Sequence, residues 1–266
     1  MRIKSILSCI LIALFIIILS AINGYTSKNY TFSDRPSITE MLSANEYYEY
    51  DVRYGFLKLG NVYVTISDTI YHNRPMYFIQ ASMVSNSNLP FVGYREYRFN
   101  SIIEEVENTI KTHFFWVDNI HRGISPTNSY LFDYEKNLVY SFEHPAKLDT
   151  LELTNHAFGG PELLLLARAH AGINEQIKYH VVIDNEIREV TTTYTTNRQN
   201  LRSQLSGERV QVYRADGFAD LNGPFGFSGS FQGYSSTDEL KLPLETRVNV
   251  WIGSAVIRLT HFEQRN

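Results

Sequence analysis

The sequence predicts a mainly β fold, a single curved antiparallel sheet or partly open β-barrel with one buried apolar helix packed on it. Three observations support this prediction. Apolar and polar residues alternate through much of the chain, which is the period of a strand with one buried face. The 266 residues include 18 Tyr and 16 Phe, and these side chains favour pleated, half-buried surfaces. Only one internal segment has the composition and the end signals of a helix.

Residues 1–24 have the pattern of a signal peptide or an N-terminal membrane anchor. Arg2 and Lys4 precede an uncharged apolar run from Ser5 to Ile22. This run is near the shortest length that spans a bilayer as a helix, so cleavage and retention both stay open. In both cases the basic residues stay in the cytoplasm. We therefore expect an extracytoplasmic protein of the bacterial periplasm or cell envelope, held at the inner membrane if the segment is uncleaved.

The rest of the chain is expected to form one domain after a short spacer. Residues 25–44 are mostly polar and predict a spacer, and residues 45–264 have a length that suits a single β-rich domain. The chain has one cysteine, Cys9, which lies too early in the apolar run to be a lipid attachment point. Downstream of that run there is no thiol for a disulfide, a metal or catalysis, so the core must supply the stability.

Alternating residues predict the strands, beginning at Glu46. Tyr48, Tyr50 and Val52 alternate with charged residues, and a second alternating run follows the turn at Gly60-Asn61. A third run from Met76 to Val84 completes a β-meander. Residues 102–110 are compatible with a strand or a helix. Further strands are expected at 94–99, 112–117, 130–132, 138–142, 177–183, 186–195, 210–214, 245–251 and 254–262.

One helix is expected between Pro161 and Gly172. Proline is favoured in the first turn of a helix, and glycine commonly follows the last turn. The interior is rich in leucine and alanine, which are strong helix formers. This segment is apolar nearly all round, so it should be buried against the sheet.

Three stretches together resemble a bacterial exported family known as domain of unknown function 3108. They are residues 49–62, the proline-started helix, and residues 236–245 with 251–259, and the resemblance covers about 46–262. It implies an envelope protein of curved antiparallel β structure with no established activity, so no catalytic residues carry over. Residues 231–235 depart from the tryptophan-led stretch often found there. The resemblance marks five positions as structural: Gly55, Gly60, Asp238, Pro243 and Gly253.

Motifs for chemistry are lacking, which favours a non-catalytic protein without metal or cofactor. Ser228 lies in a glycine-rich stretch whose spacing does not fit a nucleophile elbow. The eight histidines show no close ligand pair, and Glu104, Glu105 and Glu107 are expected to be solvated. Without Arg2 and Lys4, the chain has 22 basic and 28 acidic residues, a balance that gives no reason to expect nucleic acid.

The aromatic residues are the remaining functional signal. Such side chains can fill a core, or they can line an apolar site under a curved sheet. The predicted function is an exported envelope protein that binds a lipid or another apolar or envelope-derived ligand. Two alternatives stay open: a structural or assembly factor that binds another envelope protein through its sheet edges, and a hydrolase of envelope polymers. The candidate ligand-binding residues are Phe114, Trp116, Phe225, Phe227, Phe231 and Tyr234.

Overall fold

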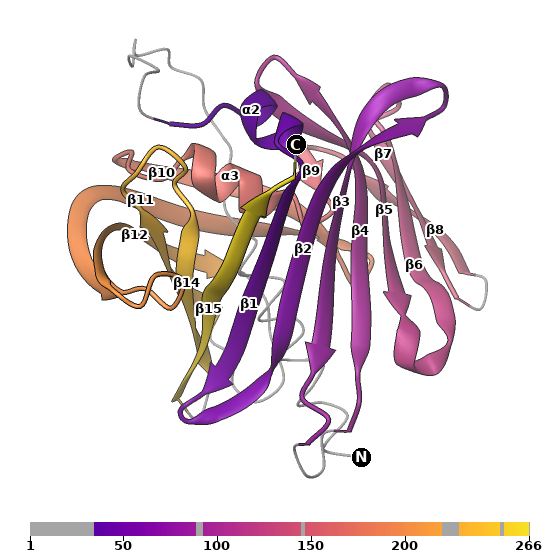
Figure 1. Cartoon of the computed structure of the whole chain (residues 1–266). Coiled ribbons are helices and arrows are strands. Elements are labelled where there is room, and N and C mark those ends of the chain that lie inside the picture. The colour runs from indigo at the N-terminus through magenta and orange to yellow at the C-terminus, as the bar shows by residue number, and fades with distance from the viewer. Residues whose placement is uncertain (1–34, 89–92, 145–146, 220–228, 251–252, 266) are drawn as a thin grey trace.

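The chain folds as one large curved sheet with two short helices at one end (Figure 1). This computed structural model describes residues 35–88, 93–144, 147–219, 229–250 and 253–265. The expected signal or anchor segment, residues 1–24, lies outside the described residues. Among the residues described, no helix is both long and apolar enough to cross a bilayer.

Fifteen strands form the sheet in the order β8-β7-β6-β5-β4-β3-β2-β1-β15-β14-β13-β12-β11-β10-β9. The first eight are β1 (Glu46–Tyr54), β2 (Leu57–Tyr71), β3 (Arg74–Ser85), β4 (Glu96–Val106), β5 (Thr109–Asn119), β6 (Ile124–Asp133), β7 (Leu138–Glu143) and β8 (Lys147–Glu152). The other seven are β9 (Ala157–Phe158), β10 (Glu175–Ile183), β11 (Glu186–Arg202), β12 (Arg209–Ala219), β13 (Ser230–Ser236), β14 (Pro243–Val250) and β15 (Gly253–Gln264).

Sequence neighbours pair in antiparallel fashion along each half of the sheet, and β1 joins the halves by pairing with β15. This pairing sets Glu46 opposite Gln264, so the start and the end of the described domain lie side by side. The short β9 is parallel to β10. Strands β8 and β9 are the two ends of the order and do not pair with each other, so the sheet is curved but unclosed. The predicted fold class is confirmed.

The alternation of side chains gives the sheet an inner, buried face and an outer face. Val62, Val64 and Ile66 of β2 point inward and are almost fully buried, whereas the residues between them are half-exposed. The inner side chains of both halves join one continuous apolar core. Most of the apolar area that drives folding is therefore removed from water on one side of the sheet.

The predicted buried helix is present as α3 (Leu163–Ala169), shorter than the segment from Pro161 to Gly172. All four leucines of α3 are buried. The chain before α3 runs close to β5, because a Cβ on Gly159 would lie 2.6 Å from the Phe115 ring. The apolar composition of α3 is therefore explained by its position against the inner face of the sheet.

The expectation of a spacer through residue 44 is wrong for its last part. Residues Ile38–Ser43 form a helix, α2, whose N-cap Ser37 makes a capping box with Glu40. Ile38, Met41 and Leu42 are buried in the core, so the three apolar residues of this polar stretch decide its structure. The described domain thus includes a helix before the first strand.

The structure resolves the ambiguous segment 102–110 as two strands and a tight turn. β4 ends at Val106, and Glu107 and Asn108 take positive φ values of 53° and 59° before β5 begins. Asparagine tolerates this left-handed backbone better than most residues. The Asn108 side chain also accepts a hydrogen bond of 3.1 Å from the backbone N–H of Ile38, which holds α2 at this turn.

Two of the expected structural glycines lie where a side chain is disfavoured. Gly55 forms the turn between β1 and β2 with a positive φ of 56°. Gly60 lies inside β2, where a Cβ would come within 2.3 Å of the carbonyl oxygen of Val84 on β3. The first needs backbone freedom, and the second needs the absence of a side chain.

Of the other three expected structural positions, Asp238 lies in the turn before β14, and Pro243 and Gly253 begin the last two strands. The Asp238 carboxylate accepts hydrogen bonds from the Ser236 hydroxyl at 2.7 Å and from the Leu240 N–H at 3.1 Å. β14 begins at Pro243 and β15 begins at Gly253. Asp238 therefore shapes the turn that leads into β14, a usual role for aspartate.

Replacing Gly60 with alanine should destabilise the protein. The added Cβ would press on backbone atoms of β3, and such overpacking costs about 1–3 kcal/mol. A Cβ on Gly233 of β13 would meet nothing within 4 Å, so Gly233→Ala is the matched control and should leave stability equal or slightly higher. Urea unfolding of both variants measures the difference. Equal unfolding midpoints for the two variants would contradict the close approach at Gly60.

Candidate functional site

A fully buried ion pair fixes the C-terminal end of α3. An Nη1 of Arg168 lies 2.5 Å from the Glu46 carboxylate and 2.6 Å from the Tyr48 hydroxyl. Its Nε donates a hydrogen bond of 2.8 Å to the carbonyl of Leu240. The Arg168 and Glu46 side chains are 1% and 0% exposed. The guanidinium thus ties α3 to the first strand and to the turn before β14.

The charges around Arg168 compensate one another. Burial alone would lower the pKa of Arg168, but the neighbouring Tyr48 and Glu46 raise it, so the guanidinium stays charged. Burial raises the pKa of Tyr48 well above its ordinary value, which keeps the phenol protonated. Its hydroxyl can then donate to Glu46, at 2.5 Å. A buried pair of this kind is tolerated because its polar atoms have close partners.

A second buried charged residue, Glu162, marks the N-terminal end of α3. Its carboxylate accepts hydrogen bonds from the Thr112 hydroxyl of β5 at 2.7 Å and from the Gly160 N–H at 2.8 Å. Burial raises the pKa of Glu162. Glu162 therefore anchors one end of α3 to β5, and Arg168 anchors the other end to β1 and to the turn before β14. The sequence indicated that Glu162 and Arg168 could anchor the helix, because a charged residue beside or within a buried apolar helix needs a partner.

A row of cross-strand neighbours crosses the inner face of five adjacent strands. The register sets Tyr50 of β1 beside Val62, Val62 beside Met83, Met83 beside Tyr97, and Tyr97 beside Asn119 of β5. Asn119 ends β5, at the far end of this strand from the turn that holds α2. We call these five residues the inner row. Its middle is apolar and its two ends carry polar groups.

Polar atoms of the inner row are buried without a hydrogen-bond partner among the described residues. These atoms are the Tyr50 hydroxyl oxygen and the Asn119 side-chain oxygen. His121, whose ring packs edge-on against Tyr97 at 5.1 Å, has the same property at Nε2. The Thr192 hydroxyl has the same property, whereas the Ser101 hydroxyl lies beside the Glu162 carboxylate, whose pKa is raised by burial and, to a smaller extent, lowered by this hydroxyl. Buried polar atoms in proteins are usually paired, so these atoms mark places where water or a ligand can bind.

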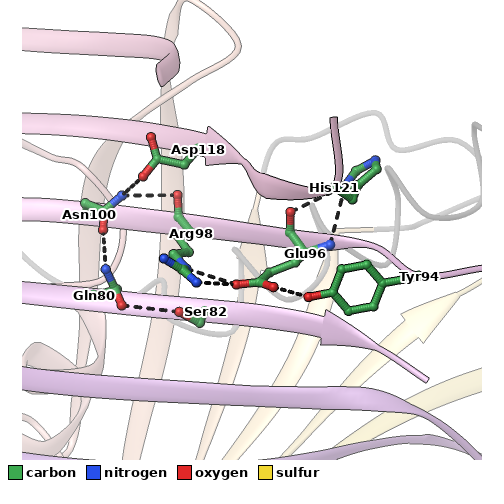
Figure 2. A network of polar contacts seen from close by, with 8 residues as sticks. All are labelled: Gln80, Ser82, Tyr94, Glu96, Arg98, Asn100, Asp118 and His121. Atoms are coloured by element: carbon green, nitrogen blue, oxygen red, sulfur yellow. Dashed lines mark hydrogen bonds and ion pairs between the residues drawn. The ribbon is translucent and has the colours of Figure 1, made fainter. Parts of the chain in front are cut away.

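A polar network covers the outer face of the same strands (Figure 2). Gln80 donates to the Asn100 side-chain oxygen at 2.8 Å, and the Asn100 amide donates to Asp118 at 3.0 Å. Asp118 also accepts a hydrogen bond of 2.7 Å from the Ser125 hydroxyl. Asn100 is 1% exposed. This network joins β3, β4 and β5 from outside and fixes the register on which the inner row depends.

The network continues along β4 toward His121 (Figure 2). Glu96 accepts hydrogen bonds from Tyr94 and, at 2.7 Å, from Arg98. Both bonds lower the pKa of Glu96, and the bond from Tyr94 is the larger cause. The His121 Nδ1 lies 3.4 Å from the backbone oxygen of Glu96. Burial, helped by Arg95, lowers the pKa of His121, so its ring is neutral at neutral pH. A neutral ring can hydrogen-bond without adding a charge to the inner face.

The structure places the predicted aromatic residues of β5 on the outer face. Phe114 and Trp116 alternate with the buried Phe115 and stack on each other at 5.1 Å. Phe78 of β3 stacks on Trp116 at 5.8 Å. Phe114 and Trp116 therefore do not line the inner face, because the period of two sends them to the side opposite Phe115.

The predicted aromatic residues of β13 point to opposite faces. Phe231 is buried on the inner side, where its ring fills the space above Gly217. Tyr234 lies under the Arg247 guanidinium, 4.8 Å from the ring centre, on the other side. Phe225 and Phe227 lie outside the described residues. Phe231 and Tyr234 are both buried members of the apolar core, whereas Phe114 and Trp116 lie on the outer face, and a ligand-binding role of these four residues stays a prediction.

The described residues offer no arrangement for metal chemistry. They contain no group of three or more His, Cys, Asp or Glu side chains placed to hold a metal ion. His113 pairs with Glu104 at 2.8 Å, and Glu104 also pairs with Arg74, so Glu104 is a half-buried, ion-paired residue rather than a freely solvated one. Ser228 lies outside the described residues.

Comparison with known proteins yields no family assignment. No protein-family model and no curated protein matches the chain, so the resemblance to domain of unknown function 3108 stays a prediction. One similar solved structure is a beta-barrel-like protein of domain of unknown function DUF1849 from Brucella abortus, with a TM-score of 0.49 and 12% identity over 84% of this chain and 98% of that chain. Another is LprF from Mycobacterium bovis, with a TM-score of 0.16 and 8% identity over 82% of this chain and 87% of that chain. Neither similarity says what this chain does.

The stability losses from removing Arg168 and from removing Glu46 should be strongly non-additive. Arg168→Met leaves the Glu46 carboxylate buried without its charge partner, a change that costs about 3–5 kcal/mol. We expect Arg168→Met combined with Glu46→Gln to be clearly less destabilised than the sum of the single variants. Urea unfolding of the four proteins gives the coupling. The exposed pair Lys136–Asp133 is the matched control and should show little coupling, whereas additive effects at the buried pair would refute its role.

The stability of the protein should fall in acid because of His170, which follows α3. Its Nδ1 donates to the carbonyl of Leu166 at 2.8 Å, and burial lowers its pKa to about 4. The unfolded chain takes up this proton near pH 6.5, so the stabilisation is complete above that pH and is lost as the pH falls toward about 4. His170→Gln should therefore lose less stability than the native protein between about pH 7 and about pH 4. His144→Gln, at an exposed position, is the control that should behave like the native chain.

Proposed function

We propose that this protein is a non-catalytic binding protein of the bacterial cell envelope, and that it takes an amphiphilic ligand on the inner face of β1–β5. The observation that carries the proposal is the inner row, where the Tyr50 and Asn119 oxygens lack partners among the described residues. Partnerless polar atoms at the ends of an apolar row match a ligand with an apolar body and a polar group.

The dimensions of the inner row favour an elongated ligand. Four strand spacings of about 4.8 Å separate β1 from β5, so the row extends over about 19 Å along the sheet. Val62 and Met83 supply an apolar middle. His121 adds a neutral ring nitrogen near Asn119, which can exchange a hydrogen bond with a hydroxyl, amide or ester group. The chemistry of the row therefore suits a lipid or another chain-like envelope molecule.

The proposed location depends on the sequence. Residues 1–24 have the pattern of a signal peptide or membrane anchor, which would place the sheet outside the inner membrane. The resemblance of residues 46–262 to domain of unknown function 3108 supports the same location. An uncleaved segment would hold the binding face close to a lipid surface.

Filling the inner row should block ligand binding. The test uses the fluorescent apolar probe N-phenyl-1-naphthylamine, displaced by palmitate or by a lysophospholipid. Met83→Trp places a large ring in the inner row and should weaken probe binding about tenfold or more, whereas Ser82→Trp, the neighbour on the opposite face of β3, should not. Equal binding by the two variants, or the absence of probe binding by the native protein, would refute the proposed function.

The polar end of the row should affect affinity without supporting the fold. Asn119→Leu removes a buried amide oxygen that has no partner, so the thermal unfolding temperature should stay equal or rise. The same change should weaken lysophospholipid binding several-fold and leave the affinity for the apolar probe unchanged. A lower unfolding temperature together with unchanged lysophospholipid affinity would instead assign Asn119 a purely structural role.

A further inference from the structure

The two ends of the sheet differ sharply in how they are protected. β9 has two residues, both fully buried, so that end offers almost no free edge. β8 has six residues, Lys147–Glu152, of which only Leu151 is partly buried. No described strand pairs with its outer side. An exposed edge strand of this length is a template for pairing with another strand.

The hydrogen bonds of β8 define which backbone groups are free. The Leu153 N–H donates to the carbonyl of Asn137 at 2.8 Å, and the register continues as Leu151 opposite Val139 and Asp149 opposite Ser141. In an antiparallel ladder, bonded residues alternate with residues whose N–H and C=O point away. The backbone groups of Leu148, Thr150 and Glu152 therefore face the open edge.

The outer face beside this edge is apolar. The Leu148 side chain is 65% exposed and stands next to Phe142 of β7, which is 45% exposed. The same row of neighbours continues through Ser129 to Trp116 of β5, and the exposed Leu131 lies beside Phe114 in the next row. We call the row from Trp116 through Phe142 to Leu148 the outer stripe. It ends at β8, where Leu148 has an apolar neighbour on one side only.

We propose that β8 pairs with β8 of a second copy of this chain, around a two-fold axis at Leu148. This register sets Leu148 opposite its own copy and pairs its free N–H and C=O groups across the axis. It also sets Lys147 opposite Asp149 of the other copy, twice. Both side chains are exposed and lie 3.7 Å apart as an ion pair within one strand, so the pairing joins two such pairs into a cluster of four alternating charges. Shifting the axis by one residue would instead set Asp149 opposite itself, which like charges disfavour.

The dimer extends both faces of the sheet. Two outer stripes become continuous through the paired Leu148 side chains, and two Lys–Asp pairs flank them on the opposite face. The inner row lies on β1–β5, away from β8, so ligand binding and pairing can be measured separately. The identical edge supplies both partners, which makes a second copy the natural occupant.

Charge reversal tests the partner and the register together. Sedimentation velocity on the full chain should show a concentration-dependent monomer–dimer equilibrium. Lys147→Glu and Asp149→Lys should each weaken the dimer about tenfold or more, because each change acts twice across the axis. The double variant Lys147→Glu/Asp149→Lys should restore dimerisation. Lys136→Glu, which alters an exposed lysine of the β6–β7 turn, is the control and should not affect it.

Blocking the edge provides an independent test. Leu148→Pro removes the N–H that faces the open edge at the axis and should abolish the dimer, while circular dichroism and the unfolding midpoint stay close to native. A native protein that stays monomeric at all accessible concentrations would overturn the proposal. Failure of the charge-swapped double variant to restore a dimer lost in both single variants would overturn the Leu148 axis.

Discussion

The buried pair of Arg168 and Glu46 is the contact on which the arrangement of this protein depends. It connects the end of α3 to β1, and β1 is the strand where the two halves of the sheet meet. Leu240, which accepts from the same guanidinium, precedes β14. One side chain thus ties together segments from the start, the middle and the end of the domain. Burying ionic groups costs desolvation free energy, but it favours one arrangement of these segments, because few other arrangements bring the two charges together.

The sheet uses its two faces differently. The inner face carries the core, α3 and the inner row, and the outer face carries polar networks and the aromatic stripe of β3–β8. The network from Gln80 through Asn100 to Asp118 holds strand register on the outside, and the same register aligns Tyr97 with Asn119 on the inside. An outward hydrogen-bond network can therefore position inward groups without touching them. This coupling follows from the period of two, since consecutive residues of a strand serve opposite faces.

The predicted site shows where residue type alone is insufficient. Phe114 and Trp116 suggested an apolar lining, yet the buried member of their run is Phe115. In an uninterrupted aromatic run, no polar residue shows which alternate positions face the solvent. Either Phe115 or the pair Phe114 and Trp116 could therefore have faced the core. Phe231 and Tyr234 are separated by three positions, which in a strand sends them to opposite faces. The inner row could not have been read from the sequence, because its members come from five strands and only their register makes them neighbours.

The sequence by itself determined the fold class, the start of the sheet at Glu46 and the one buried apolar helix, because alternation and helix composition are local properties. The resemblance marked Gly55 and Asp238 only as structural positions, and the structure places both in turns. Only the tertiary structure decided that Ile38 and its helical neighbours join the core, that Arg168 is buried against Glu46, and that β8 is left as an open edge. These features depend on which segments distant in sequence come into contact. Such contacts, and not a residue's neighbours in the chain, decide burial, charge pairing and strand order.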